Sequence, residues 1–166
     1  WLASANLEVV ADDGYLGSPY RNARVFGAAV PERNPRTRTS RAVKLRSLYD
    51  LSEFGPRASA RAEYRYFWDT WAIKAHTVEL GYSRYFGDPW LADAFVRFNS
   101  QQGALFYSDN ATSETTYVSR NRQLSSFDSS GFGVKLSYLL TRVEGQYELR
   151  AHGAYERIRF KYGEFT

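Results

Sequence analysis

Hydrophobic and polar residues alternate along most of this chain with a period of two, and no helical stripe is visible. The stretch from 42 to 51 is the clearest case: Val43, Leu45 and Tyr49 alternate with Lys44 and Arg46. Successive side chains of a β-strand point to opposite faces. The stretch therefore predicts a strand with one aromatic-aliphatic face and one charged face.

The same period predicts seven strands. They cover residues 2–10, 40–51, 58–68, 72–86, 91–101, 132–140 and 146–160. Several reach the ~9–11 residues that a tilted membrane-spanning strand needs, whereas globular strands are most often ~5–6 residues long. Membrane strands and a soluble sheet are thus both open at this point, and the connections help to choose between them.

Tight and longer connections alternate. The segments "SEFGPR", "GDPW" and "TRVEG" carry the Gly, Pro and Asp of tight turns. Two of the other connections, about 11–39 and 102–131, are long and polar. Short periplasmic turns and long extracellular loops are typical of outer-membrane barrels. We therefore expect an all-β, antiparallel up-and-down transmembrane β-barrel, or part of one, as a single domain over residues 1–166.

Strand parity adds a further expectation. If the tight turns are periplasmic, the first and the seventh strand both run outward, and seven strands do not close a bacterial barrel of the usual even number. Open sheet edges are not tolerated in lipid. The chain is therefore interpreted as the C-proximal portion of a longer barrel.

Composition excludes some chemistry and leaves the membrane hypothesis standing. The chain has no Cys, which rules out disulfides, thiolate metal sites and cysteine nucleophiles. No run approaches the ~20 apolar residues of a membrane helix. The mean hydropathy of −0.52 suits a soluble protein, yet only every second residue of a barrel strand faces lipid. Aromatic residues make up 17% and cluster near strand ends, as in the girdles of membrane barrels.

Four segments, in order, resemble a known family: "ADDGYLGSPYRN", "VPERNPRTRTSRAVKLR", "EYRYFWDTWAIKAHTVELGYSRYFGD" and "RFNSQQGALFYSD". They are similar to the back half of a domain-of-unknown-function family of bacterial outer-membrane proteins, over most of residues 8 to 108. The resemblance implies a barrel in the outer membrane and no established activity.

The charged face is the first candidate site. It carries both signs on neighbouring strands, so cross-strand ion pairs are expected. The charge ladder consists of Lys44, Arg46, Arg61, Glu63, Arg65, Glu79, Arg97, Lys135, Glu148 and Arg150. It is either a salt-bridge lattice that fills a narrow barrel or the wall of a passage that selects solutes.

The second candidate is an arginine-rich loop with Arg33, Arg36, Arg38 and Arg41. Guanidinium groups suit phosphate or carboxylate, so the partner is lipopolysaccharide phosphate, an anionic solute or an acidic protein. A solvated loop held by Glu32 and nearby acids is the alternative. Nucleic acid is not expected as a partner, because the excess charge is local.

Catalytic and metal chemistry find little support. His76 and His152 are the only histidines, a weak basis for a metal site. Ser83 with His76 is a numerical candidate for a hydrolase, but no nucleophile-elbow motif accompanies it. We expect no enzyme, metal or cofactor.

The expected function is therefore an integral outer-membrane barrel that acts as pore, scaffold or sheath. Its expected partners are outer-membrane lipid, lipopolysaccharide and other membrane or periplasmic subunits. The alternative is a soluble β-barrel or sandwich that binds a small ligand or glycan, and an outer-membrane hydrolase is the third hypothesis.

Overall fold

A computed structural model describes residues 1–18, 20–54 and 57–163. Pro19 of the "GSPY" segment, the Gly55–Pro56 pair of the first predicted tight turn and the last three residues lie outside that description. The side chain of Phe54 does so as well.

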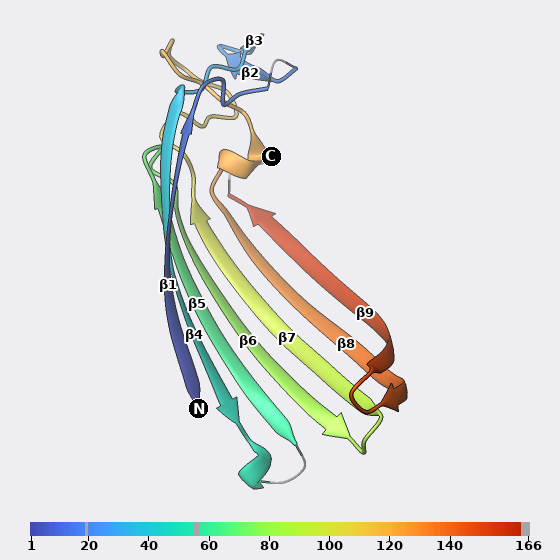
Figure 1. The fold of residues 1–166 in the computed structure, drawn as a ribbon. Helices are drawn as coiled ribbons and strands as arrows, with labels where there is room; N and C mark the ends of the chain where they lie inside the picture. The colour runs from blue at the N-terminus through green and yellow to red at the C-terminus, as the bar shows by residue number, and fades with distance from the viewer. Residues whose placement is uncertain (19, 55–56, 164–166) are drawn as a thin grey trace.

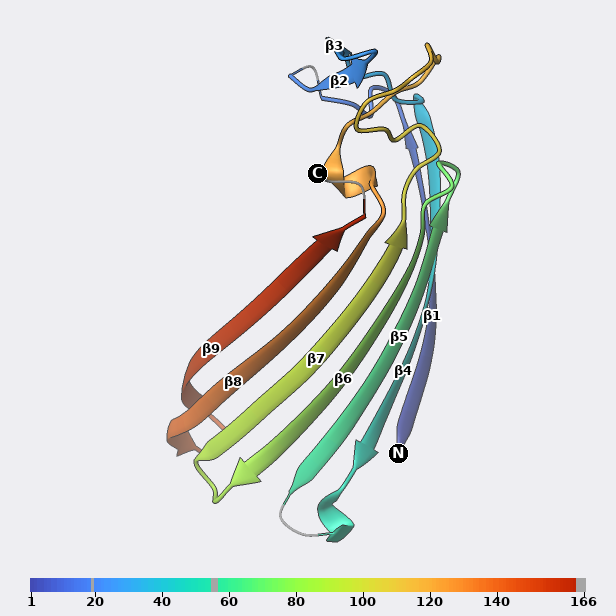
Figure 2. The same ribbon diagram turned by 180° about the vertical axis from the view of Figure 1, so that it is seen from behind.

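Seven antiparallel strands form one sheet in the order β1-β4-β5-β6-β7-β8-β9 (Figures 1 and 2). Their bounds are β1 Leu2–Asp13, β4 Thr37–Asp50, β5 Ala58–Asp69, β6 Lys74–Phe86, β7 Trp90–Gln102, β8 Phe127–Val143 and β9 Tyr147–Tyr162. A separate two-stranded sheet pairs β2 (Asn22–Val25) with β3 (Ala28–Pro31). Two short 3-10 turns, η1 (Ser52–Phe54) and η2 (Arg122–Leu124), are the only helical elements among the described residues.

The predicted strands are all present, and the all-β, antiparallel up-and-down class is confirmed. Two local differences are informative. β8 begins at Phe127 rather than at 132, because the polar run Asp128–Ser130 pairs with the end of β7 although it has the composition of a loop. The hairpin of β2 and β3 was not predicted, since four-residue strands are too short to show a period.

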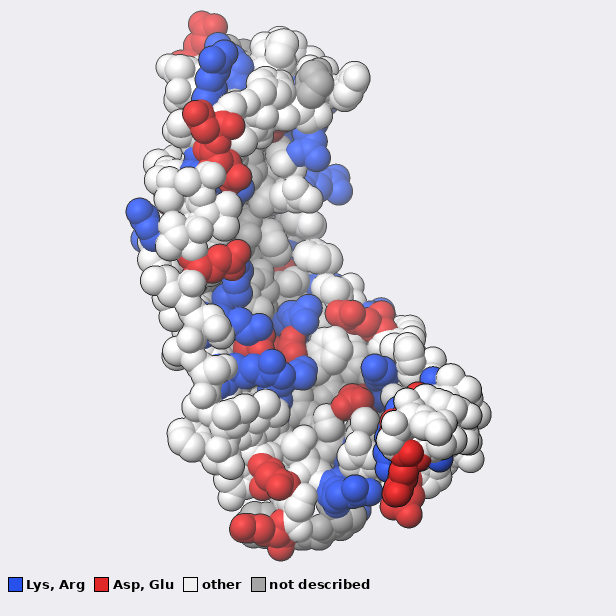
Figure 3. Space-filling view, viewed as in Figure 1, with Lys and Arg blue, Asp and Glu red and all other residues white. Residues whose placement is uncertain are grey.

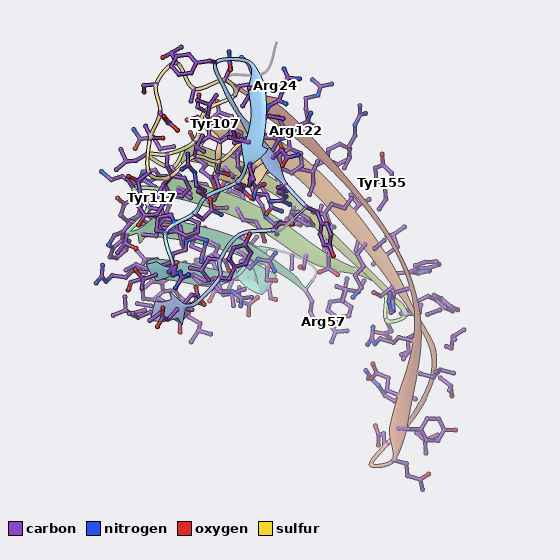
Figure 4. The ribbon with its side chains drawn as sticks, turned by 90° about the horizontal axis from the view of Figure 1, so that it is seen from above. Arg24, Arg57, Tyr107, Tyr117, Arg122 and Tyr155 are labelled. Atoms are coloured by element: carbon purple, nitrogen blue, oxygen red, sulfur yellow. The ribbon has the colours of Figure 1, made fainter. Side chains whose placement is uncertain are left out.

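The sheet curves strongly and is open. Neighbouring strands lie along an arc when the molecule is seen from above (Figure 4). β1 and β9 are its two edges, and no ladder joins them among the described residues. The curvature gives the sheet a hollow face and an outward face. The hollow face carries Lys44, Glu63, Glu79 and Arg97; the outward face carries Val43, Tyr64, Val78 and Val96.

The two ends of the sheet differ as the connections indicated. The connections from β4 to β5, from β6 to β7 and from β8 to β9 lie at one end. The last two are tight, over residues 87–89 and 144–146, and there Gly87 and Gly145 adopt positive φ angles of 63° and 74°. Residues 14–36, 70–73 and 103–126 lie at the other end. The two long loops are narrower than the expected 11–39 and 102–131, because the flanking strands extend into them.

The long loops pack together into one unit, which we call the loop cap (residues 14–18, 20–36, 70–73 and 103–126). Val25 bridges to Ala111 and Arg33 to Val118, so the first loop pairs with the second. One small core contains Ala23, Val25 and Val118. A second core joins the cap to the sheet and is formed by Trp71, Ile73, Ala104 and Leu124.

Large apolar side chains remain exposed on the outward face. Leu45, Leu80, Leu136 and Leu149 are 48%, 51%, 54% and 53% exposed. No second layer covers this face in the part of the chain that the structure describes (Figure 2). No helix among the described residues is both long and apolar enough to cross a membrane.

Candidate functional site

All ten residues of the charge ladder lie on the hollow face. Directly opposed residues of an antiparallel pair share a face, and the register aligns Arg46, Glu63, Glu79 and Arg97 in one row across four strands. Figure 3 shows acidic and basic side chains gathered along the hollow of the molecule. The sequence period alone thus placed these side chains together.

Glu79 is the centre of the ladder. Its Oε1 accepts from Arg61 at 2.6 Å, and its Oε2 accepts from Nε and Nη2 of Arg97 at 2.8 and 2.6 Å. The residue is 8% exposed. A covered carboxylate of this kind is stable only when it is paired and hydrogen-bonded. The three side chains therefore form a closed ion-pair group across β5, β6 and β7.

The neighbouring acid has cations of its own. Glu63 is directly opposite Glu79, an arrangement that repels when the charges are not compensated. Lys44 lies 2.8 Å and Arg46 lies 3.9 Å from the Glu63 carboxylate. Each acid of the row is thus flanked by two cations, which favours a lattice of paired charges over a field of one sign.

The rest of the ladder is less tightly connected. Near the tight-turn end, the Glu148 carboxylate forms ion pairs with the Arg142 guanidinium, at 2.5 Å, and with the Arg150 guanidinium. Arg65 is 3.7 Å from Glu8 of β1. Lys135 is exposed and lies opposite Asp93, whose Oδ1 accepts from the Ser83 hydroxyl at 2.6 Å.

The tight-turn end also contains a capped carboxylate just beyond the apolar part of β4. The Ser52 hydroxyl and the Ser52 backbone N–H both donate to Asp50. These hydrogen bonds lower the pKa of Asp50, because they stabilise its charged form.

A cavity of 420 Å³ lies on the hollow face beside the ladder. Glu63, Glu79 and Arg97 line one part of it, and Phe127, Ile158 and Phe160 line another. Sequence reasoning missed these apolar members. The available signal was a reversal of the alternation in β9, where the hydrophobic residues after Glu156 change to the even-numbered face.

The four arginines of the predicted anion-binding loop do not form one surface. Arg38 is on the hollow face, 2.7 Å from Asp69 and over the ring of Trp71 at 4.6 Å. Arg41 is opposite Trp68 and Val9 on the outward face. Arg33 and Arg36 are exposed. Anion binding by this loop stays a prediction, and any such site uses only some of its arginines.

Asp69 anchors the loop cap to the sheet. Its Oδ1 accepts from the backbone N–H groups of Trp71 and Ile73, both at 2.9 Å, and its Oδ2 accepts from Arg38 at 2.8 Å. The indole N–H of Trp71 donates to the carbonyl of Thr37 at 3.0 Å. The "DTW" segment, which the sequence marked only as a short connection, is thus the joint between β4, β5 and the cap.

Glu32 is not the counter-ion of the arginine loop. It is 6% exposed and accepts a hydrogen bond from the Ser119 hydroxyl, 87 residues away in the sequence. The bond ties the first long loop to the second within the cap. Figure 4 shows Arg24, Tyr107, Tyr117 and Arg122 gathered in this same region, whereas Tyr155 lies out on β9.

The candidate hydrolase pair does not assemble. His76 is on the outward face, where its Nδ1 lies 2.7 Å from the Tyr64 hydroxyl, and Ser83 is on the hollow face. Their side chains project from opposite sides of β6. No three His, Asp or Glu side chains group as metal ligands in the described ranges.

The fold and the two faces define an all-β protein with an antiparallel up-and-down sheet and a charged hollow face. The chain belongs to the DUF3570 family, described as a protein of unknown function, whose sequence model matches residues 1–159. The expected membership of an uncharacterised domain family is thereby confirmed. No curated protein and no solved structure matches the chain.

Proposed function

We propose that this chain forms the wall of an outer-membrane β-barrel and acts there as pore, scaffold or sheath. The observation that carries the proposal is the inverted polarity of the sheet. Paired charges such as Arg61 and Glu79 occupy the hollow face, while Leu80 and its apolar neighbours are exposed on the outward face. Lipid on one side and an enclosed watery interior on the other suit this distribution.

The outward face carries a bounded apolar belt. In β6 to β9 the outward residues are apolar over the middle of each strand and become polar toward the loop cap. The polar positions toward the loop cap are His76, Lys74, Ser100, Gln102, Ser130, Asp128, Arg157, Arg159 and Lys161. A belt of limited height is what the hydrocarbon layer of a membrane requires.

Aromatic pairs lie toward both ends of this belt. Trp90 and Tyr138 contact each other toward the tight-turn end, with ring centroids 4.7 Å apart. Phe132 and Tyr155 do so closer to the cap, at 6.1 Å. Aromatic side chains favour the membrane–water interface, so these pairs support two girdles. In this proposal the cap faces the outside of the cell and the tight turns face the periplasm.

The proposal requires partners for both sheet edges. Unpaired backbone groups of β1 and β9 would cost several kcal/mol each in lipid, so these strands are hydrogen-bonded to further strands in the membrane. Outer-membrane lipid and lipopolysaccharide contact the outward face. Other membrane or periplasmic subunits are the candidate proteins.

The paired ladder favours a structural lattice over a selective passage. Charges held by neutralising partners, as Glu79 is held by Arg61 and Arg97, offer little net field to a passing ion. A soluble ligand-binding protein would need cover for its outward face, and a hydrolase would need a nucleophile next to a base. The geometry favours neither.

Membrane fractionation of cells that express the full natural protein tests the proposal. We expect the protein in the outer-membrane fraction, resistant to a urea wash and extracted only by detergent. Recovery as a monodisperse protein in detergent-free buffer would overturn it. Planar-bilayer recordings then separate the roles: stable conductance supports a pore, and its absence from a closed barrel supports scaffold or sheath.

A further inference from the structure

The outward face of β9 changes its chemistry within the strand. Tyr155 is the last residue of its apolar part, and Arg157, Arg159 and Lys161 follow toward the cap. All three are exposed. We call these three residues the β9 cationic patch. None of the ion pairs among the described residues uses Arg157 or Arg159.

Membrane energetics give the position of this patch. An Arg or Lys on the lipid face costs about 2–4 kcal/mol at the bilayer midplane and about 0–1 kcal/mol near an interface. The patch begins where the apolar belt ends, and the neighbouring outward residues Ser130 and Ser100 are polar as well. It therefore lies at headgroup level, on the side of the loop cap.

A groove of 340 Å³ adjoins the patch on the same face. Val96, Phe98 and Phe132 supply its apolar wall, and Arg157 and Arg159 line its other side. The groove exists because β8 has the small residue Ser130 between Phe98 of β7 and Arg159 of β9. An apolar slot beside two guanidinium groups is complementary to an acyl chain that carries a phosphate.

We propose that the β9 cationic patch and its groove bind a phosphorylated glycolipid of the outer leaflet. The phosphate lies on Arg157 and Arg159, and one acyl chain lies along Phe98 and Phe132. This inference rests on the proposed membrane location. It identifies the lipid-binding surface on β9, not on the arginine-rich loop from 33 to 41.

Binding of defined lipids to the detergent-purified protein tests the inference, with native mass spectrometry as the readout. The probes are bis-phosphorylated lipid A, the same lipid A with its phosphates removed, phosphatidylglycerol and inorganic phosphate. We expect bis-phosphorylated lipid A to bind best, and inorganic phosphate not to displace it. Equal binding of the dephosphorylated lipid, or displacement by inorganic phosphate, would overturn the inference.

The variant Arg157→Gln/Arg159→Gln should weaken binding of bis-phosphorylated lipid A by about tenfold or more, since two charge-assisted contacts are lost. Lys74→Gln/Arg84→Gln is the matched control: it also removes two outward cations, both on β6 and outside the arginine-rich loop, and its affinity should not change. An equal loss in both variants would indicate nonspecific charge attraction and would overturn the inference.

The two proposals fail separately. If the protein stays monodisperse without detergent, both the proposed membrane location and the lipid site are contradicted. If the protein is extracted only by detergent, but the Arg157→Gln/Arg159→Gln variant binds lipid A as tightly as the natural protein, only the lipid site is contradicted. Heat-dependent gel mobility of each variant verifies that it folds.

Discussion

The ring of Phe95 on β7 covers Gly133 on β8. The two residues are directly opposite on the hollow face, and a Cβ on Gly133 would lie 2.6 Å from Cζ of the ring and closer still to Cε1. The same ring carries the Arg97 guanidinium at 5.3 Å. The glycine therefore provides the space that lets Phe95 support a member of the Arg61–Glu79–Arg97 group.

Gly133→Ala should destabilise the protein by about 1–3 kcal/mol, because a methyl group forces the Phe95 ring out of place. Chemical unfolding in detergent micelles measures this loss. Gly153→Ala is the control, since no atom lies within 4 Å of its added Cβ. In a Phe95→Ala background, which lacks the ring, Gly133→Ala should destabilise the protein less than it does in the natural protein. Equal stability of the two glycine variants would contradict the account.

Glu79→Gln should destabilise the sheet by about 1.5–3 kcal/mol, because charge-assisted hydrogen bonds from Arg61 and Arg97 lose their anion. Thermal unfolding followed by gel mobility provides the measurement. Glu148→Gln, in the more exposed group at the tight-turn end, should have a clearly smaller effect. The reverse order would show that the Glu79 group is not the stronger part of the ladder.

Leu80→Lys tests the medium that contacts the outward face. Leu80 is opposite Ala62 and Val96 in the middle of the apolar belt. A lysine there should destabilise the folded protein in lipid vesicles by about 2–4 kcal/mol, whereas Ser100→Lys near the cap should destabilise it by about 0–1 kcal/mol. Urea titration in vesicles compares them. In water, Leu80→Lys would be harmless, so an unchanged midpoint argues against lipid contact.

Asp69→Asn should loosen the loop cap. The Asp69 side chain is fully buried against Arg38, and removing its charge leaves a partly covered cation without its counter-ion. Limited proteolysis should cut residues 14–36 and 103–126 several-fold faster. Asp88→Asn is the control, because the Arg57–Asp88 pair is 3.5 Å long and largely exposed. Equal cleavage rates would remove Asp69 from its anchoring role.

The sequence by itself determined the strands and their two faces. Whether Val43 and Lys44 point to opposite sides depends only on the pleat of an extended backbone, which is a local property. That property was sufficient to place Arg46, Glu63, Glu79 and Arg97 on one face. It also separates Arg38 from Arg41, since their odd spacing puts them on opposite faces, although composition alone had grouped them.

Only the tertiary structure decided which side chains become partners. The Glu32–Ser119 bond and the Val25–Ala111 bridge join loops more than 80 residues apart, and Phe95 meets Gly133 only in the observed register of β7 and β8. Register and loop packing depend on the sum of many distant contacts. No local pattern encodes that sum, so the sequence predicted the faces of the sheet but not the loop cap or the exact ion pairs.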